Sequence, residues 1–398
     1  MSTLVFDPYD WATQEDPYPT YARMRAEAPL YRNDERDFFA VTRHADVDAV
    51  MRNDEVFSNN RGVSLDPTSW NRHAHLTMSF LAMDPPDQTR LRKLVSRGFT
   101  PRRVRELEPR IVEMTREHLD RVRPGTTFDW IAELAGRVPM DVISEMMGVP
   151  VADRAEVRRL ADLVVHREDG VTDVPPAGMH AALTLIGYYT DLLKDRRANP
   201  GDDMTSALIE AEIDGDKLLD SEIIAFLFLM VVAGNETTTK LLGNALFHLA
   251  AHPEQKRRVL DDETLVGNWV EETLRFDTST QMLARHVLRD TEIHGKQIPA
   301  GSRLVVLLGS ANRDDRVFRE PDTFDISRTR EEFGNSLSFG IGKHFCLGAN
   351  LARLEANAVL GEFRRQVADF TVDVERAVRV HSSNVRGFAE LPIEVTWR

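Results

Sequence analysis

Apolar residues recur at helical spacing, every third or fourth position, along most of the chain, and this pattern is typical of amphipathic helices. The pattern predicts helices at residues 19–28, 45–53, 89–98, 101–123, 130–147, 152–166, 179–199, 204–210, 221–251, 253–261, 264–276 and 347–368. The helix at 221–251 opens with the longest apolar run of the chain, residues 223–234, which indicates that it is deeply buried.

Strand patterns are shorter and fewer than helix patterns. They predict strands at residues 30–31, 38–42, 291–293, 296–298, 303–308, 369–372 and 393–396. Turn residues such as His294 and Gly295 separate several of these stretches. The sequence therefore predicts a mostly α protein with a minor β portion. Because no internal repeat or low-complexity linker divides the chain, we expect one domain covering residues 1–398.

Composition limits the class of protein. The hydrophobic content of 42% and the charged content of 29% are typical of a globular protein in water. The first residues show no basic stretch followed by an apolar one, and the longest apolar run is shorter than the about 20 residues that span a bilayer. We therefore expect a cytoplasmic location and no membrane partner. A net charge of −14 argues against nucleic acid as a partner.

One cysteine, Cys346, is present in the whole chain, within FGIGKHFCLG at residues 339–348. A single thiol excludes an internal disulfide, a cysteine-held iron–sulfur cluster and a multi-cysteine zinc site. A lone cysteine is most often a small buried hydrophobe. Here, however, Gly340, Gly342 and Gly348 surround it, and glycines allow a backbone to approach a flat group closely or to adopt positive φ.

The most apolar helix contains a stretch that weakens it, AGNETTT at residues 233–239. Glycine costs about 1 kcal/mol relative to alanine inside a helix, and Asn and Thr are also poor helix formers. Threonine hydroxyls can bond the carbonyl one turn back and open a local bulge. A structural kink alone is one explanation of this stretch, but a buried acid beside an alcohol, Glu236 and Thr237, favours proton delivery.

Several motifs follow one another in a fixed order: DPPDQTRLR at 84–92, AGNETT at 233–238, EETLR at 271–275, ANRD at 311–314, PDTFDISR at 321–328 and FGIGKHFCLG at 339–348. Together they resemble the cytochrome P-450 family of haem-thiolate monooxygenases, in its soluble bacterial class, over nearly the whole chain. The resemblance implies the cytochrome P-450 fold, with haem between the central long helix and the helix that follows the cysteine loop.

The resemblance also implies roles for individual residues around a haem b group. Cys346 is expected to be the axial ligand of the haem iron, with Phe339, Gly340 and Gly348 shaping its loop. Arg92, Arg285 and His344 are expected to hold the haem propionates. Gln88 stands where many relatives have histidine, and it is expected to reach a propionate as a neutral donor.

Two further groups of residues take their roles from the resemblance. Glu236 and Thr237 match the acid and alcohol that guide protons during dioxygen activation. Glu272 and Arg275, three residues apart on one helix face, are expected to form a structural pair that Arg328 joins. The stretch FDTSTQM after Arg275 lacks the proline that relatives often have there, so the path of that loop is left open.

By resemblance, the substrate pocket is apolar, and the segments 57–80 and 169–176 contribute to it. Its expected lining residues are Leu229, Val232, Ala233, Thr280 and Val385. Steroid, terpenoid, fatty acid, aromatic acid and antibiotic precursor all remain open as substrates. Charged residues of the first segment, Arg61, Arg72 and His73, either anchor a carboxylate or face solvent.

The resemblance also implies that a cluster of basic residues on this acidic chain borders the haem site: Arg90, Lys93, Arg97, Arg102, Arg103 and Lys343. It is either a solvated surface or a docking site for an acidic redox partner, a ferredoxin with its reductase.

The leading interpretation is a monooxygenase that inserts one oxygen atom from O2 into an apolar small molecule, most simply by hydroxylation, with electrons from a redox partner. The alternative is a haem-thiolate protein that binds ligands or senses gas without turnover, which would need the thiolate but no proton relay. A zinc hydrolase using His344 and Cys346 lacks further ligands.

Overall fold

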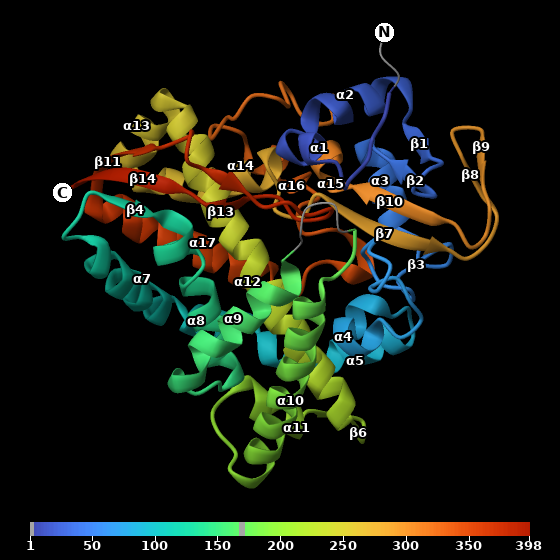
Figure 1. Cartoon of the computed structure of the whole chain (residues 1–398), viewed down its shortest axis with the longest axis horizontal. Coiled ribbons are helices and arrows are strands. Elements are labelled where there is room, and N and C mark those ends of the chain that lie inside the picture. Colours follow the sequence, from blue (N-terminus) through green and yellow to red (C-terminus); the bar gives the residue numbers. More distant parts are fainter. Residues whose placement is uncertain (1–3, 167–171) are drawn as a thin grey trace.

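A computed structural model describes residues 4–166 and 172–398 of the chain (Figure 1). The α-helices are α1 (Trp11–Glu15), α2 (Tyr18–Glu27), α3 (His44–Arg52), α4 (His75–Met78), α5 (Asp87–Val95), α6 (Pro101–Glu106), α7 (Glu108–Val122), α8 (Val138–Met147), α9 (Arg154–Val165), α10 (Pro176–Ala198), α11 (Met204–Glu210), α12 (Asp220–Ala251), α13 (Pro253–Asp261), α14 (Val266–Phe276), α15 (Leu308–Ala311), α16 (Arg330–Gly334) and α17 (Ala349–Gln366). This mostly helical architecture confirms the predicted fold class.

The strands are β1 (Leu30–Asn33), β2 (Phe38–Val41), β3 (Phe57–Ser58), β4 (Thr127–Asp129), β5 (Glu212–Ile213), β6 (Asp216–Lys217), β7 (Met282–Val287), β8 (Thr291–Ile293), β9 (Lys296–Ile298), β10 (Arg303–Leu307), β11 (Val367–Val372), β12 (Val378–Arg379), β13 (Phe388–Glu390) and β14 (Pro392–Trp397). Five of them form a sheet in the order β1-β2-β10-β7-β3, in which β2 and β10 are parallel. A second sheet has the order β11-β14-β4, at the opposite side of the molecule (Figure 1).

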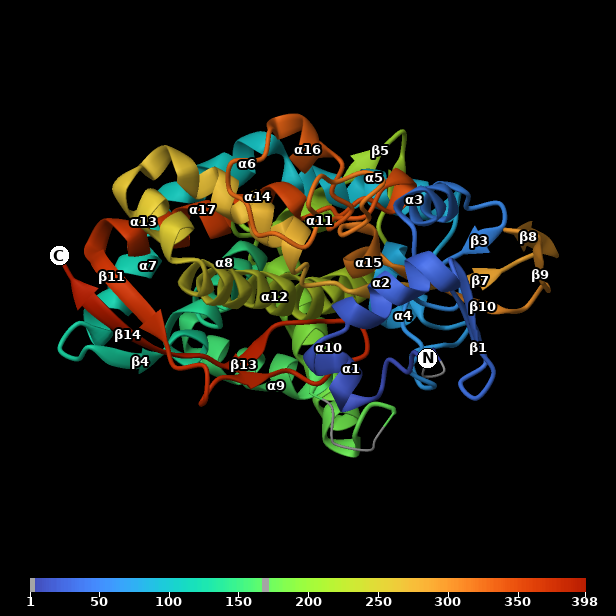
Figure 2. The same ribbon diagram turned by 90° about the horizontal axis from the view of Figure 1, so that it is seen from above.

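The central element is α12, which runs through the middle of the molecule with α14 on one side and α9 and β13 on the other (Figure 2). Among the described helices it is the one whose length and apolar composition would suffice to cross a membrane. Its side chains instead belong to the largest hydrophobic core, where Phe226, Leu242 and Leu246 are fully buried. A helix that is apolar on most sides is stable when protein surrounds it, and α12 is such a core helix.

Two predicted helices are each divided in the structure. The predicted helix at 101–123 consists of α6 and α7, which meet at Leu107, and Pro109 lies in the first turn of α7. The predicted helix at 130–147 consists of a π-helical turn at Ile131–Ala135 and of α8, which has Pro139 in its first turn. Proline lacks an N–H donor and clashes with the preceding turn, so each new helix begins just before its proline.

Strand β7 was not predicted, because it carries a charged residue at a buried position. Arg285 lies in the middle of β7 and is almost fully buried, so the strand lacks the expected alternation of apolar and polar residues. Arg285 pairs with Leu304 of β10 in an antiparallel register. The predicted strand at 303–308 ends one residue early, since α15 begins at Leu308.

Candidate functional site

A cavity lies between α12, β7 and the loop that carries Cys346, and we call it the central cavity. Its wall contains Cys346, Arg92, Arg285, His344 and Glu355, and most of its other lining residues are apolar. The remaining lining residues include Met51, Phe80, Leu81, Ile143, Leu229, Met230, Ala233, Gly234, Thr237, Thr238, Leu241, Leu283, Phe339 and Leu351. The structure thus gathers residues from distant parts of the sequence around the one thiol.

Two glycines hold the cysteine loop close to α3. Gly340 and Gly342 have φ values of 68° and 75°, in the left-handed region that side chains rarely adopt. A Cβ atom at Gly340 would lie 2.9 Å from the Cε of Met51, and one at Gly342 would lie 3.0 Å from the Met51 carbonyl oxygen. Any larger residue would therefore both strain the backbone and displace the loop.

Cys346 lies three residues before the first residue of α17, Ala349, and its thiol opens into the central cavity while protein surrounds the rest of the side chain. Its own N–H donates to the Phe339 carbonyl at 2.9 Å, which closes the loop. Burial raises the pKa of the Cys346 thiol, while the N–H groups of Gly348 and Ala349 and the charge of Arg92 oppose that rise. N–H groups at the start of a helix and a nearby guanidinium stabilise the negative charge of a thiolate, so this loop suits a sulfur that binds a metal cation.

Two side chains, Arg92 and His344, present unpartnered donors or ring nitrogens to this cavity, and Arg285, whose Nη1 donates to the Ala284 carbonyl at 2.9 Å, also lines it. Arg92 donates from Nη2 to the Phe345 carbonyl at 2.6 Å, but its buried Nη1 has no partner. Neither ring nitrogen of His344 has a partner, and burial, together with Arg285 and Arg92, lowers the pKa of His344 to about 3. Burial likewise lowers the pKa of Arg285 to about 10.

Buried cations without partners are costly, so a cavity with this wall favours a ligand that carries anionic groups. A haem group has two propionate carboxylates and an iron that accepts a thiolate. The residues present therefore fit haem: a thiol at a helix start, apolar walls, and guanidinium groups at the edge of the same cavity.

Gln88 does not face this cavity. Its amide Nε2 donates to the Lys343 carbonyl at 2.9 Å, and Gln88 is not among the described residues that line the central cavity. In this structure Gln88 braces the cysteine loop, and its expected contact with a propionate stays a prediction. Phe339 and Gly348 line the cavity, and the guanidinium of Arg353 lies 4.5 Å above the Phe339 ring.

The expected acid and alcohol of α12, Glu236 and Thr237, lie on different faces of the helix. The Thr237 hydroxyl donates to the Ala233 carbonyl at 2.9 Å, and Thr237 lines the central cavity. Glu236 lines a second cavity on the other side of α12, which we call the outer cavity. Consecutive helix residues point about 100° apart, so an adjacent acid and alcohol reach two different spaces. α12 continues through this stretch without a break.

Of the five expected substrate-contacting residues, three line the central cavity: Leu229, Ala233 and Thr280. The other two do not. Val232 is one position away from Ala233 on the helix and packs against the main hydrophobic core. Val385 lines a separate small cavity.

The segment 57–80 reaches the central cavity through Phe80. Its charged residues Arg61, Arg72 and His73 are not among the described residues of the cavity wall, so they offer no anchor there. In the expected segment 169–176, positions 169–171 lie outside the described residues. Asp173 joins the two segments, since its carboxylate accepts hydrogen bonds from the Thr68 N–H at 3.0 Å and from the Thr68 hydroxyl at 2.5 Å.

Glu355 is a cavity residue that the sequence analysis missed. It lies on α17, is 3% exposed, and has the Thr238 hydroxyl as a hydrogen-bond partner. Burial raises its pKa to about 8. The signal was present in the sequence, because Glu355 falls between Leu351 and Val359 at four-residue spacing on the buried face of α17.

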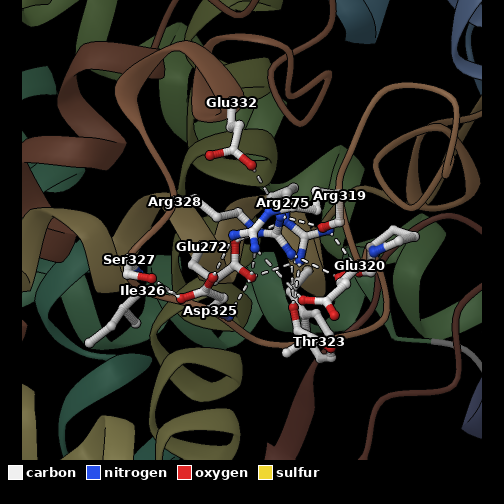
Figure 3. Close-up of polar contacts among 12 residues, drawn as sticks. Glu272, Arg275, Arg319, Glu320, Thr323, Asp325, Ile326, Ser327, Arg328 and Glu332 are labelled. Atoms are coloured by element: carbon white, nitrogen blue, oxygen red, sulfur yellow. Dashed lines mark hydrogen bonds and ion pairs between the residues drawn. The ribbon is translucent and has the colours of Figure 1, made fainter.

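Figure 3 shows a cluster of polar contacts around Glu272, Arg275 and Arg328. The Glu272 carboxylate accepts hydrogen bonds from Arg275 at 2.7 and 2.8 Å and from Arg328 at 3.2 Å. Arg275 also donates to the carbonyls of Asn312 and Pro321. This fully buried cluster joins α14 to the chain segment that leads into the cysteine loop.

The loop after Arg275 takes a defined path without a proline. The Ser279 hydroxyl donates to the Thr237 carbonyl at 2.8 Å, and the Asp277 carbonyl accepts from the Asn244 amide at 2.9 Å. The Arg386 N–H donates to the Ser279 carbonyl at 2.8 Å. These bonds hold the loop against α12 and bring Thr280 to the cavity wall.

Comparison with known proteins places this site in a family. Residues 178–392 match the family model "Cytochrome P450". A protein of Mycobacterium tuberculosis named "Putative cytochrome P450 123" is 57% identical, covering 99% of this chain and 98% of that protein. The "Vitamin D(3) 25-hydroxylase" of Pseudonocardia autotrophica is 36% identical, covering 95% of this chain and 94% of that protein.

Solved structures of cytochromes P450 have the same fold as this chain. Cytochrome P450 CYP109Q5 from Chondromyces apiculatus superposes with a TM-score of 0.89 at 36% identity, over 99% of this chain and 98% of that chain. CYP109E1 from Bacillus megaterium, in complex with testosterone, superposes with a TM-score of 0.85 at 32% identity, over 95% of this chain and 99% of that chain.

Proposed function

Because the chain belongs to the cytochrome P450 family and is therefore a haem-containing monooxygenase, we propose that it hydroxylates a neutral, apolar small molecule with one oxygen atom from O2. The observation that carries the proposal is the convergence of Cys346, Arg92, Arg285 and His344 on one otherwise largely apolar cavity. Bound haem, in the b form, would supply the oxygen-activating chemistry. The residues of this chain would then hold the group, exclude water and direct protons.

Each side chain has a role that follows from its position. Cys346 would ligate the iron through Sγ, and the N–H groups of Gly348 and Ala349 would stabilise the charge on that sulfur. Arg92, Arg285 and His344 would pair with the two propionates. The Thr237 hydroxyl would hold a proton-donating hydrogen-bond network at the cavity, supplied from Glu236 on the other side of α12.

The choice of a neutral substrate follows from the wall opposite the cysteine loop. Residues of α12 and of the loop at 278–280 that line the central cavity are all uncharged. A carboxylate substrate would therefore find no cationic anchor there. We propose a steroid-like polycycle, since relatives are named for vitamin D3 and bound to testosterone, with the Thr280 hydroxyl as a polar contact.

The test is to titrate the purified haem protein with neutral steroids and with fatty acids of similar size, and to follow the low-spin to high-spin shift of the iron. We expect shifts and hydroxylated product with the neutral compounds, and none with the acids. Thr237→Ala should keep the spin shift while product per electron falls several-fold and peroxide rises. Binding without any product in the parent protein would favour the ligand-binding or gas-sensing alternative.

For the electron supply, we propose a ferredoxin-type partner with its reductase, docking near the cysteine loop in the cytoplasm. Half of the six residues in the basic cluster pair with acidic side chains, so fewer of them contribute positive charge to the surface than the sequence suggests. Arg90 pairs with Asp216 and Glu222, Arg102 with Glu106, and Lys343 with Asp54. Lys93, Arg97 and Arg103 are exposed and therefore carry the positive charge of this face.

Charge reversal tests the docking site. Lys93→Glu and Arg97→Glu should slow electron transfer from the ferredoxin several-fold at low salt and flatten its salt dependence, because complementary charge chiefly raises the association rate. Substrate binding should not change. Arg257→Glu is the matched control, since it makes the same change of charge at an exposed position on α13, at the other end of the molecule from α5 (Figure 1). Equal rates and salt dependence in all three variants would place the partner elsewhere.

A further inference from the structure

The outer cavity lies across α12 from the central cavity, and several charged residues line it. Its volume is about 690 Å³, which is space for many water molecules. α9, α12, β12 and the segment around the π-helical turn form its wall. Its titratable and charged residues are Arg158, Asp162, His166, Glu236, Lys240, Arg379 and His381. Figure 2 shows how α9 and β13 flank α12 on this side.

Lys240 is the most unusual residue of this wall, because its charge is buried. The residue is 7% exposed, and its Nζ donates to the Phe388 carbonyl at 3.1 Å. The same Nζ lies 3.9 Å from the carboxylate of Glu236, one helical turn before it. Its aliphatic stem packs against Gly387, where a Cβ atom would approach the Lys240 side chain to 2.5 Å.

A buried ammonium needs nearby negative charge to remain protonated. Burial lowers the pKa of Lys240, while the carboxylates of Glu236 and Asp162 raise it. Conversely, the ammonium attracts the Glu236 carboxylate toward the outer cavity and away from the apolar core. Glu236 is the acid next to Thr237, whose hydroxyl faces the central cavity.

We propose that Lys240 is a positioning residue for proton uptake, which holds the Glu236 carboxylate in the outer cavity so that protons enter α12 from water on that side. This inference rests on the proposed monooxygenase function. Its new step is the part of Lys240 at the outer cavity, whereas proton transfer through Glu236 and Thr237 belongs to the proposed function.

The decisive variant is Lys240→Met, which keeps the stem that packs against Gly387 and removes the charge. Without the ammonium, ionised Glu236 is less stable, because a positive charge at about 4 Å favours the charged form of an acid. We expect the acidic limb of the pH profile of product per electron to move up by about one pH unit. The substitution leaves the other charged residues of this wall unchanged in sequence, namely Arg158, Arg379, Asp162, His166 and His381, so the shift reports the loss of the ammonium.

A second readout needs no turnover. The infrared band of a protonated carboxyl group that disappears in Glu236→Gln identifies the Glu236 titration, and its midpoint should rise by a similar amount in Lys240→Met. The double variant gives a further test: because Lys240 is proposed to act through Glu236, Lys240→Met should add no further uncoupling to Glu236→Gln. If the losses of product per electron in the two single variants add up in the double variant, Lys240 has a structural role that is independent of Glu236.

Lys256→Met is the matched control. Lys256 also donates to a phenylalanine carbonyl, that of Phe370 at 2.8 Å, and pairs with Asp369 at 2.7 Å, but it lies on α13. This control should leave both the pH profile and the infrared midpoint unchanged. An unshifted midpoint in Lys240→Met would overturn the inference even if hydroxylation is intact. If the parent protein forms no product, the proposed function fails, while the infrared midpoint still decides the role of Lys240.

Discussion

Glu272 and Glu355 are both buried glutamates within the helices that frame the cysteine loop, yet their surroundings differ completely. Glu272 on α14 accepts hydrogen bonds from two guanidinium groups and from the Asp325 N–H (Figure 3). Glu355 on α17 has one hydroxyl, that of Thr238, as its partner, and burial raises its pKa to about 8. One carboxyl group is therefore held as an anion and the other is stable as a neutral acid.

Burial alone therefore does not determine the charge or the role of a carboxyl group; its hydrogen-bond and ion-pair partners do. Glu272 is a structural anion, because two cations depend on it and would be left unpaired without it. Glu355 lines the central cavity and, with its pKa raised to about 8 by burial, keeps a proton at neutral pH. Replacing each glutamate by glutamine, which has the same shape and no charge, distinguishes the two cases, because the expected changes in stability have opposite signs.

The largest change in the stability of the folded protein is expected for Glu272→Gln. The change leaves the buried Arg275 and Arg328 without a counter-charge, and breaking a buried pair costs about 3–5 kcal/mol. We expect the urea midpoint of unfolding to fall sharply, with poor haem retention. Glu331→Gln, an exposed position on the nearby helix α16, is the control and should leave the midpoint within error. A Glu272→Gln protein as stable as the control would contradict the structural role.

Glu355→Gln should instead stabilise the protein, by an amount that depends on pH. The folded protein holds the Glu355 proton up to about pH 8, whereas the unfolded chain releases it near 4.5. The stability of the parent protein therefore falls through this window, by about 1.4 kcal/mol per pH unit for this one group. Relative to the parent, Glu355→Gln should be equally stable below pH 4.5 and progressively more stable up to about pH 8.

The measurement is a series of urea unfolding curves between pH 4.5 and pH 9 on both proteins. A stability difference between them that does not change with pH would show that Glu355 is ionised when folded, like Glu272, and would remove the contrast between the two acids.

The smallest effect is expected for Thr238→Val, which removes the hydroxyl partner of Glu355 and keeps the shape of the side chain. That hydroxyl favours the ionised form of Glu355, so the pKa of Glu355 should rise further and the upper end of the window should move to higher pH. A stability loss of about 1 kcal/mol at pH 9 is expected, from unfolding curves measured as above. Thr239→Val, whose hydroxyl bonds the Ala135 carbonyl, is a control that should not move the window.

The sequence predicted much of the scaffold and part of the site. Apolar spacing located α12 and α17 to within two residues at each end, because long helices with a buried face have a strong period. Spacing also placed Glu272 and Arg275 on one helix face, where they form two hydrogen bonds. The prolines that begin α7 and α8 and the buried Arg285 in β7 obscured the pattern elsewhere.

What the sequence could not supply was the direction of individual side chains. Val232 is one helical position away from Ala233, which lines the cavity. Gln88 is one turn before Arg92 yet bonds the backbone of the cysteine loop, and motif matching does not resolve such differences in direction. Glu355 was missed for a related reason, since a charged residue on a buried helix face is read as a surface position. Tertiary contacts, which join segments far apart in the chain, decide these cases.

The most direct test of haem-thiolate ligation by Cys346 is the absorption spectrum of the reduced carbon monoxide complex, recorded for the parent protein and for Cys346→Ser. We expect the strongly red-shifted Soret band of thiolate ligation in the parent protein, because Cys346 is the one thiol of the chain and opens into the central cavity. The serine variant should lose this band and all hydroxylation. A parent spectrum without the band, or a serine variant that keeps it, would contradict the account.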